Sequence, residues 1–272
     1  MNLRDTVAAA LDEDLGPLGD LTAALLPRAA TAEAVIVPRG DGILAGTLPA
    51  VQAYHHHNPW TVSLELLAED GEQLVAGEPI ARLHGSLAHM LTVERTALNF
   101  LSHLSGIATL TRRYVDAVAG TGVRIRDTRK TTPGLRALEK AAVRAGGGVN
   151  HRGNLSDGIL IKDNHLGGMT ITDAVAAARR MWTGRPVQVE CDRIEQVEEA
   201  LTTFAELVLL DNMSPDEVRA CVEFVAGRSL VEVSGGVTLD TVAAYAAAGP
   251  TFISVGAITH SAPILDIGLD LC

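Results

Sequence analysis

The second half of the chain repeats one pattern of apolar and polar positions. A short run of β-branched and other apolar residues leads to a polar or glycine-containing end, and an amphipathic stretch rich in Ala, Leu and Val follows. Unbroken apolar runs of this kind predict buried parallel strands, each followed by a helix. The predicted strands lie at 123–130, 158–162, 187–190, 207–211, 230–234 and 252–256.

The spacing of these runs indicates the architecture. Their C-terminal ends are 32, 28, 21, 23 and 22 residues apart, which is about one strand–helix unit each. Repeated units of this kind form a parallel sheet, and a run of six favours a closed or partly closed (β/α) barrel. Helix signals lie between the runs: Ser214 with Pro215 begins one predicted helix, and Thr238 begins another that ends at Gly249.

The first hundred residues follow a different pattern, which predicts an α+β domain. A helix is predicted near 2–12, and a long helical stretch at 89–119 leads into the second half. Strands are predicted at 33–38, 61–67 and 74–84, with a tight hairpin over 69–81.

We therefore predict two domains in an α/β protein. The first covers 1–104 and the second, the barrel of about six to seven parallel strands, covers 105–259. The C-terminal segment 260–272 is a candidate to pack back onto the first domain.

Composition supports this architecture and limits the cellular setting. Hydrophobic residues make up 47% of the 272 residues and aromatic residues only 3%, which suits helices packed on buried strands. The acidic start lacks the apolar core of a signal peptide, and no uncharged run reaches the roughly 18 residues of a membrane span. We expect a cytoplasmic protein without a membrane partner. The three cysteines (191, 221 and 272) lack a Cys-x-x-Cys pair, which argues against a disulfide framework and a zinc site.

Lysine is confined to one stretch of this arginine-rich chain. Lys130, Lys140 and Lys162 lie within 33 residues, and between 124 and 162 there are nine Lys or Arg residues against three acids. This segment carries +6, against −17 for the rest of a chain whose net charge is −11. A basic island in an acidic protein favours a small polyanionic ligand over nucleic acid, which usually binds a wholly basic domain. A lysine-tolerant surface helix is the alternative explanation.

The predicted strand ends carry chemistry in an ordered way. In (β/α) barrels the carboxyl ends of the strands face the active site. Cations there suit an anionic substrate, and acids on two neighbouring strands suit Mg²⁺, which prefers carboxylates together with phosphate oxygens. The residues at these ends are Arg129, Lys130, Lys162, Glu190, Asp211, Ser234 to Gly236, and Gly256.

The glycines of the last two strand ends add a phosphate site. Backbone N–H groups at 234–236 and 255–257 are open at the starts of helices, where barrels commonly hold a phosphate. Taken singly, a glycine at a strand end more often only forms a turn, and an acid at a strand end can simply cap a helix. Their recurrence on successive strands indicates an enzyme that holds an anionic small molecule beside a Mg²⁺-bound phosphorylated compound.

Several long segments together resemble the quinolinate phosphoribosyltransferase family. The most specific are 127–152 (DTRKTTPGLRALEKAAVRAGGGVNHR) and 160–165 (LIKDNH). The resemblance covers nearly the whole chain, because further matches lie at 13–22 (EDLGPLGDLT), 94–108 (ERTALNFLSHLSGIA), 209–213 (LLDNM) and 255–270 (VGAITHSAPILDIGLD).

The resemblance implies a fold, a reaction and an assembly. The fold is an N-terminal α/β open sandwich packed on an irregular (β/α) barrel. The reaction joins quinolinate to 5-phosphoribosyl 1-pyrophosphate with Mg²⁺ and gives nicotinate mononucleotide, pyrophosphate and CO₂ on the de novo route to NAD. The assembly is a homodimer, with a hexamer left open, in which the partner's N-terminal domain closes the site.

The resemblance also implies roles for single residues, of which Lys130, Lys162, Glu190 and Asp211 are the candidate catalytic ones. Glu190 and Asp211 would bind the ribose hydroxyls and Mg²⁺, and Arg95 would reach the partner's pocket. The roles of Lys140 and His165 stay open. The quinolinate pocket would comprise Arg129, Lys130, His151, Arg152 and Lys162, with Thr128 as a further substrate-binding residue, and the 5-phosphate would be held by Ser234, Gly235, Gly236, Val255, Gly256 and Ala257.

Two other functions remain as alternatives. A paralogous group associated with molybdenum transport shares the fold and much of the Thr-Arg-Lys region, but its pattern does not keep 161–165 (IKDNH) intact. A non-catalytic barrel that binds a phosphoribosyl ligand as a sensor would show binding without turnover. The full set of cations and acids favours the biosynthetic enzyme.

Overall fold

The computed structural model describes residues 2–56 and 60–272 and divides the chain into two compact units. Unit 1 comprises Met1–Arg112, Thr131–Gly147 and Thr259–Cys272, and unit 2 comprises Arg113–Lys130 and Gly148–Ile258. The segment Thr131–Gly147 thus groups with unit 1, although the sequence pattern had assigned it to the second domain.

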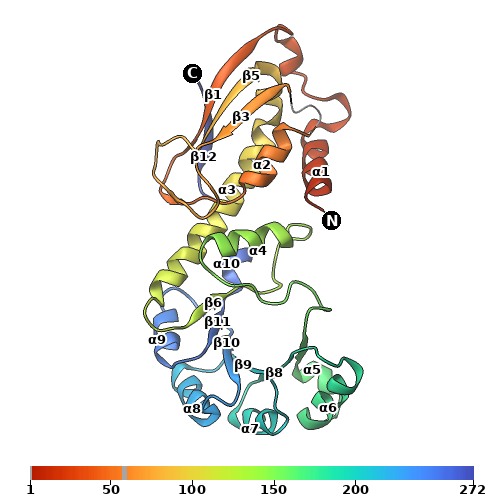
Figure 1. Ribbon diagram of the computed structural model, residues 1–272, viewed down its shortest axis with the longest axis vertical. Coiled ribbons are helices and arrows are strands. Elements are labelled where there is room, and N and C mark those ends of the chain that lie inside the picture. The colour runs from red at the N-terminus through yellow and green to blue at the C-terminus, as the bar shows by residue number, and fades with distance from the viewer. Residues whose placement is uncertain (1, 57–59) are drawn as a thin grey trace. The chain divides into compact units, whose positions relative to one another are not determined.

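Unit 1 is built on a four-stranded antiparallel sheet with the order β12-β1-β5-β3. The strands are β1 (Thr31–Pro38), β3 (Val62–Leu66), β5 (Ala81–Ser86) and β12 (Ile267–Leu271). The last of these comes from the C-terminal segment and completes the sheet beside β1 (Figure 1). The helices of the unit are α1 (Leu3–Leu15), α2 (Thr47–Tyr54), most of α3 (Leu87–Ala117) and α4 (Arg136–Ala145), with short 3₁₀ turns at Gly16–Leu18 and Ala23–Leu25.

The hairpin predicted over 69–81 is wrong. Instead, β4 (Gln73–Leu74) pairs antiparallel with β2 (Gly42–Ile43), and β5 begins only at Ala81 and pairs with β3. Gly77 adopts a φ of +86° between β4 and β5, and Pro79 has no N–H to donate to a ladder. These two residues divide an apolar run that the sequence pattern treated as one strand.

Unit 2 contains a six-stranded parallel sheet with the order β6-β11-β10-β9-β8-β7, which confirms the predicted parallel α/β architecture. Among the described residues no strand pairing joins β6 to β7, so the sheet is an open barrel. Its strands are β6 (Arg124–Arg126), β7 (Ile159–Ile161), β8 (Val187–Cys191), β9 (Leu207–Asp211), β10 (Leu230–Ser234) and β11 (Phe252–Ser254).

Helices cover one side of this sheet. Figure 1 shows α6, α7, α8 and α9 along its outer side. In the chain these helices come after β7, β8, β9 and β10, respectively. The predicted start of α8 is confirmed, because Ser214 and Glu217 cap each other there. α9 begins later than predicted because Thr238 and Thr241 form a hydrogen-bonded turn before it. The helices are α5 (Asp163–Leu166), α6 (Ile171–Met181), α7 (Ile194–Thr202), α8 (Pro215–Val225), α9 (Val242–Ala247) and α10 (Ala257–His260).

The strands of unit 2 bury their apolar side chains on both faces, as their sequence predicts. On the neighbouring strands β8 and β9, Val189, Cys191, Val208 and Leu210 are fully buried on one face, and Leu207 and Leu209 are buried on the other. Burial raises the pKa of Cys191 to about 12, so this thiol stays protonated and belongs to the core. None of the helices formed within 2–56 and 60–272 combines the length and apolar composition of a membrane span.

A close contact within unit 1 requires glycine at position 106. A Cβ atom there would overlap the carbonyl oxygen of Pro263 and would stand 3.0 Å from the Cα atom of Ile264. The middle of α3 therefore passes close to the chain that leads into β12.

We expect Gly106→Ala to lower the free energy of unfolding by about 2 kcal/mol or more, because this overpacking exceeds the gain of about 1 kcal/mol in helix propensity. Urea unfolding at fixed pH measures the change. Gly40→Ala is the control, since its Cβ would meet only Leu265 Cδ1 at 3.9 Å. Equal stability of the two variants would contradict the contact.

Candidate active site

The carboxyl ends of the unit 2 strands bring most of the predicted site residues to one edge of the sheet. Lys162 directly follows β7, and Glu190 lies one residue before the end of β8. Asp211 and Ser234 are the last residues of β9 and β10 and are paired across the ladder. Val255, Gly256 and Ala257 follow β11.

Arg129 and Lys130 lie in a loop, since β6 ends at Arg126 and not at the predicted residue 130. The strand ends early because the buried Asp127 carboxylate accepts hydrogen bonds from Asn150 Nδ2 (2.5 Å) and from the His151 N–H (2.7 Å). Thr128 Oγ1 then accepts from the Lys130 N–H at 3.0 Å. Asp127 thereby joins this loop to the segment that carries His151.

The electrostatic field beside this loop is positive. Partial burial lowers the pKa of Arg152, and the positive charge of Arg129 lowers it further, against an opposing effect of Asp157. The guanidinium of Arg152 donates to the Gly158 carbonyl oxygen at 2.9 Å. Because the positive charge of Arg129 disfavours the charge of Arg152, an anion bound near both would relieve this repulsion.

Lys162 and Glu190 form an ion pair across the ends of β7 and β8. Lys162 Nζ lies 2.5 Å from Glu190 Oε2, and the side chains are 40% and 14% exposed. The sequence pattern placed both residues at the site but did not indicate that they pair. His165, whose role was open, accepts the Lys162 N–H through Nδ1 at 3.1 Å and so closes the turn that begins α5.

Asp211 is the second acid of the site. Its Oδ2 accepts from the side-chain amide of Asn212 at 2.7 Å, and Asn212 has a φ of +57°. Within the described part of the chain, no group of three or more His, Cys, Asp or Glu residues is arranged to hold a metal ion. Glu190 and Asp211 are only two carboxylates, on neighbouring strands. Such a pair suits Mg²⁺ when phosphate oxygens and water complete the coordination of the ion.

Glycine is required at the end of β10. Gly235 has a φ of +96°, and a Cβ atom there would lie 2.7 Å from Asn212 Cγ. The Asn212 N–H also donates to the Ser234 carbonyl oxygen at 2.9 Å, so the ends of β9 and β10 are held together. Of the predicted phosphate amides, that of Val255 already donates to the Arg126 carbonyl oxygen at 2.9 Å.

Glu232 is a buried charge at the site that the sequence interpretation missed. Its fully buried carboxylate on β10 accepts from Arg126 Nη1 and Gln188 Nε2, both at 2.8 Å, and from Ser254 Oγ. Its Oε1 also lies 3.6 Å from His151 Nε2. An isolated acid inside an apolar strand run was the available signal.

Two predicted residues belong to unit 1. Arg95 is exposed on α3, and its role in a partner's site stays a prediction. Lys140 is buried on α4, next to Glu139, whose carboxylate lies 2.8 Å from His103 Nε2.

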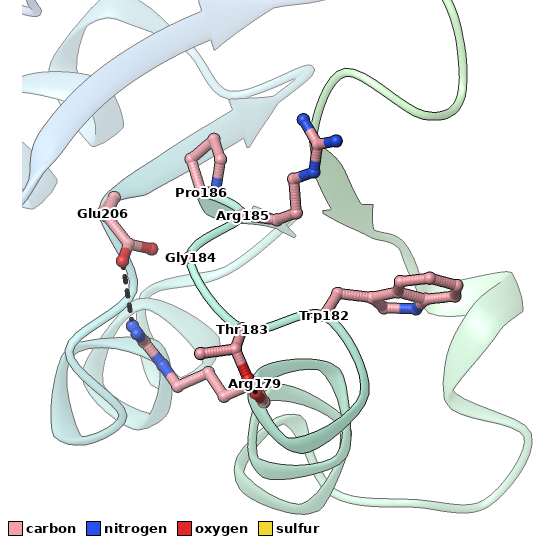
Figure 2. A pocket seen from close by; sticks show the side chains of 7 residues that line it. All are labelled: Arg179, Trp182, Thr183, Gly184, Arg185, Pro186 and Glu206. Atoms are coloured by element: carbon pink, nitrogen blue, oxygen red, sulfur yellow. Dashed lines mark hydrogen bonds and ion pairs between the residues drawn. The ribbon is translucent and has the colours of Figure 1, made fainter.

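Cavities elsewhere in the described part of the chain are lined by none of the predicted residues. A 650 Å³ cavity in unit 1 is lined by α1, α3 and residues 132–135. A 360 Å³ cavity in unit 2 lies where α6 ends and β8 begins, and Figure 2 shows Arg179 and Glu206 on one side of it. These two residues form an ion pair of 3.2 Å at the opposite ends of the strands from the candidate site.

Comparison with curated proteins finds relatives over nearly the full length. A Mycobacterium leprae protein named nicotinate-nucleotide pyrophosphorylase (carboxylating) is 44% identical over 98% of this chain and 96% of that protein. A Bacillus subtilis protein named a probable enzyme of the same kind is 43% identical over 95% of this chain and 90% of that protein.

Solved structures agree. The nicotinate-nucleotide pyrophosphorylase of Francisella tularensis has a TM-score of 0.95 and 35% identity, covering 99% of this chain and 96% of that chain. The enzyme of the same name from Ehrlichia chaffeensis has a TM-score of 0.95 and 40% identity, covering 100% and 99%.

Family models match both halves of the chain. The model of the quinolinate phosphoribosyl transferase N-terminal domain matches residues 20–105, and that of the C-terminal domain matches residues 107–270. Because these matches cover most of a chain whose strand ends carry the expected cations, acids and glycines, the protein belongs to the quinolinate phosphoribosyltransferase family.

Proposed function

We propose that the chain transfers the phosphoribosyl group of 5-phosphoribosyl 1-pyrophosphate to quinolinate and releases pyrophosphate and CO₂. The product is nicotinate mononucleotide, and the reaction belongs to the de novo synthesis of NAD. Membership of the family supports this reaction, and the observation that carries it to this site is the cationic cluster around Arg129 and Arg152. A dianion such as quinolinate would relieve the repulsion between these groups.

Quinolinate binds among the cations on one side of the site. Arg129 and Arg152 face its two carboxylates as planar guanidinium groups, and Lys130 and Lys162 add point charges. Thr128 and His151 belong to the same loops, which Asp127 joins through its hydrogen bond to the His151 N–H (2.7 Å).

The phosphoribosyl donor binds at the neighbouring strand ends. Its 5-phosphate lies against Ser234, Gly235 and Gly236, where Gly235 and Gly236 have positive φ values, and against the amides of Gly256 and Ala257. Glu190 and Asp211 bind the ribose hydroxyls and hold Mg²⁺, which neutralises pyrophosphate charge when bound. Lys162, 2.5 Å from Glu190, connects the two substrate positions.

The chemistry needs positioning and electrostatic support more than a protein nucleophile. The bond from C1 of the ribose to pyrophosphate breaks through an oxocarbenium-like state, and the ring nitrogen of quinolinate forms the new bond. The ring nitrogen then carries a positive charge, which stabilises the electron pair left on C2 when the 2-carboxylate departs as CO₂. A proton from solvent adds to C2 and completes nicotinate mononucleotide.

We further propose a homodimer in which Arg95 of one copy completes the quinolinate pocket of the other. Arg95 is exposed on α3, so its guanidinium is accessible to a second copy. A fifth basic side chain near a dianion would add to the positive field.

Incubation of the purified chain with quinolinate, 5-phosphoribosyl 1-pyrophosphate and Mg²⁺ should give nicotinate mononucleotide and CO₂ in equal amounts. Chelation of Mg²⁺ by EDTA should stop the reaction, and nicotinate should not replace quinolinate. Tight binding of the phosphoribosyl donor without product would favour a sensor, and equal turnover of nicotinate would contradict the proposed substrate.

Lys130→Ala and Arg152→Ala should each lower kcat/KM for quinolinate by more than about 10-fold, because each removes a charge-assisted contact worth roughly 1.5–3 kcal/mol. Steady-state kinetics at saturating donor measures the loss. Arg179→Ala is the matched control, since it removes an arginine whose ion pair with Glu206 lies at the other ends of the strands. Near-normal kinetics in both site variants would show that the pocket lies elsewhere.

Mixtures of inactive Arg95→Ala and Lys162→Ala chains should regain activity through hybrid dimers. Each hybrid has one site with both residues intact, so random pairing restores roughly a quarter of all sites. Subunit exchange is followed by native mass spectrometry in parallel with the assay. Proven exchange without recovered activity would refute a site shared between copies.

A further inference from the structure

We infer that Glu232 is a positioning residue, which keeps the imidazole proton of His151 on Nε2 and thereby holds His151 and Arg152 in the arrangement that receives a dicarboxylate. The inference deepens the proposed function, because it assumes that His151 and Arg152 bind quinolinate. The state of the His151 ring can be measured without any substrate.

The first argument is the burial of Glu232. Its carboxylate is completely buried between the apolar residues Val231 and Val233 of β10. Burying a charge is costly even when it is paired, and an apolar residue of similar size would often be at least as stable. Arg126, Gln188 and Ser254 nevertheless supply hydrogen bonds from three other strands. Stability alone therefore does not explain this carboxylate.

The second argument is the hydrogen bonding of His151. The backbone N–H of Arg152 donates to His151 Nδ1 at 2.7 Å, so Nδ1 presents a lone pair and carries no proton. The neutral ring must then carry its proton on Nε2. That atom faces Glu232 Oε1 at 3.6 Å, an ion-pair distance at which the negative charge favours a proton on the facing nitrogen.

The third argument concerns the alternative tautomer. A proton on Nδ1 would face the Arg152 N–H, and the 2.7 Å hydrogen bond would be replaced by two opposed donors. Nε2 would then present a lone pair to Glu232 Oε1, and the negative charge of this carboxylate disfavours that arrangement. The charged groups near His151 are Glu232, which is itself paired with Arg126, Asp127, which accepts the His151 backbone N–H, and Arg152, which is next in the chain.

Glu232→Gln tests this mechanism with little change in shape. Glu232 Oε2 accepts from two N–H donors, Arg126 and Gln188, so the amide oxygen of the variant must take that place. The amide NH₂ group then occupies the position of Oε1 and faces His151 Nε2 as a donor. This arrangement opposes a proton on Nε2 and should shift the ring toward the Nδ1 tautomer.

The readout is the ¹⁵N NMR spectrum of protein labelled in its histidine rings, with His151→Gln used to assign the signals. Substrate-free wild-type protein at neutral pH should show His151 with the proton on Nε2. Glu232→Gln should show a mixture of tautomers, and its KM for quinolinate should rise roughly 10-fold, the size seen when a carboxylate behind a ligating histidine is lost. The KM for the donor should stay unchanged, and kcat should change less than the KM for quinolinate.

Ser254→Ala is the matched control. It removes one donor to the same carboxylate but leaves the charge that faces His151. It should keep the wild-type tautomer and the wild-type KM for quinolinate, even if its stability falls.

Several outcomes would overturn the inference. Wild-type protein with the His151 proton on Nδ1 would do so whether or not the Glu232→Gln variant folds. The inference would also be overturned if Glu232→Gln kept the wild-type tautomer of His151 and the wild-type KM for quinolinate. A Ser254→Ala variant that showed the tautomer shift expected of Glu232→Gln would overturn it as well. If wild-type protein keeps the Nε2 proton but forms no nicotinate mononucleotide, the proposed function fails and the role of Glu232 in fixing the ring stands.

Discussion

The parallel register of six strands is the constraint on which the site depends. Each strand ends beside the next at the same edge of the sheet, with Asp211 paired to Ser234 and Glu190 level with Leu209. This ladder brings together residues that are more than a hundred positions apart in the chain, such as Arg126 and Glu232. The helices between the strands contribute no predicted ligand except at their first residues. The sheet therefore sets the spacing of the charges, and the loops set their exposure.

Charges of both signs are layered at this edge. The acids Asp127 and Glu232 are fully buried and accept hydrogen bonds from the sheet and from the loop that carries His151. Arg129 and Arg152 lie in the same loops and are half-buried, and the charge of Arg129 lowers the pKa of Arg152. Such an arrangement holds the cations in place before the substrate arrives, so less reorganisation is needed when a dianion binds.

The sequence alone was sufficient where the signal is local, and insufficient where it depends on a distant partner. Apolar runs predicted all six parallel strands and placed Lys162, Glu190, Asp211 and Ser234 near their ends. The end of β6 was misplaced because the hydrogen bonds of Asp127 go to residues 150 and 151. The hairpin over 69–81 was wrong because β4 pairs with β2, about 30 positions earlier. The Lys162–Glu190 pair and the contacts of Glu232 likewise require the folded register.

The pairing of β12 with β1 has a consequence for biosynthesis. Arg39 at the end of β1 bonds to Asp270 across 231 residues, so the sheet of unit 1 stays one strand short while all of unit 2 is translated. Until then, β1 presents an unpaired strand edge, a surface that invites pairing with other chains. During that time the partly folded chain carries a strand edge of the kind that makes folding intermediates prone to aggregate. A truncation that removes β12 would therefore endanger solubility before it affects catalysis.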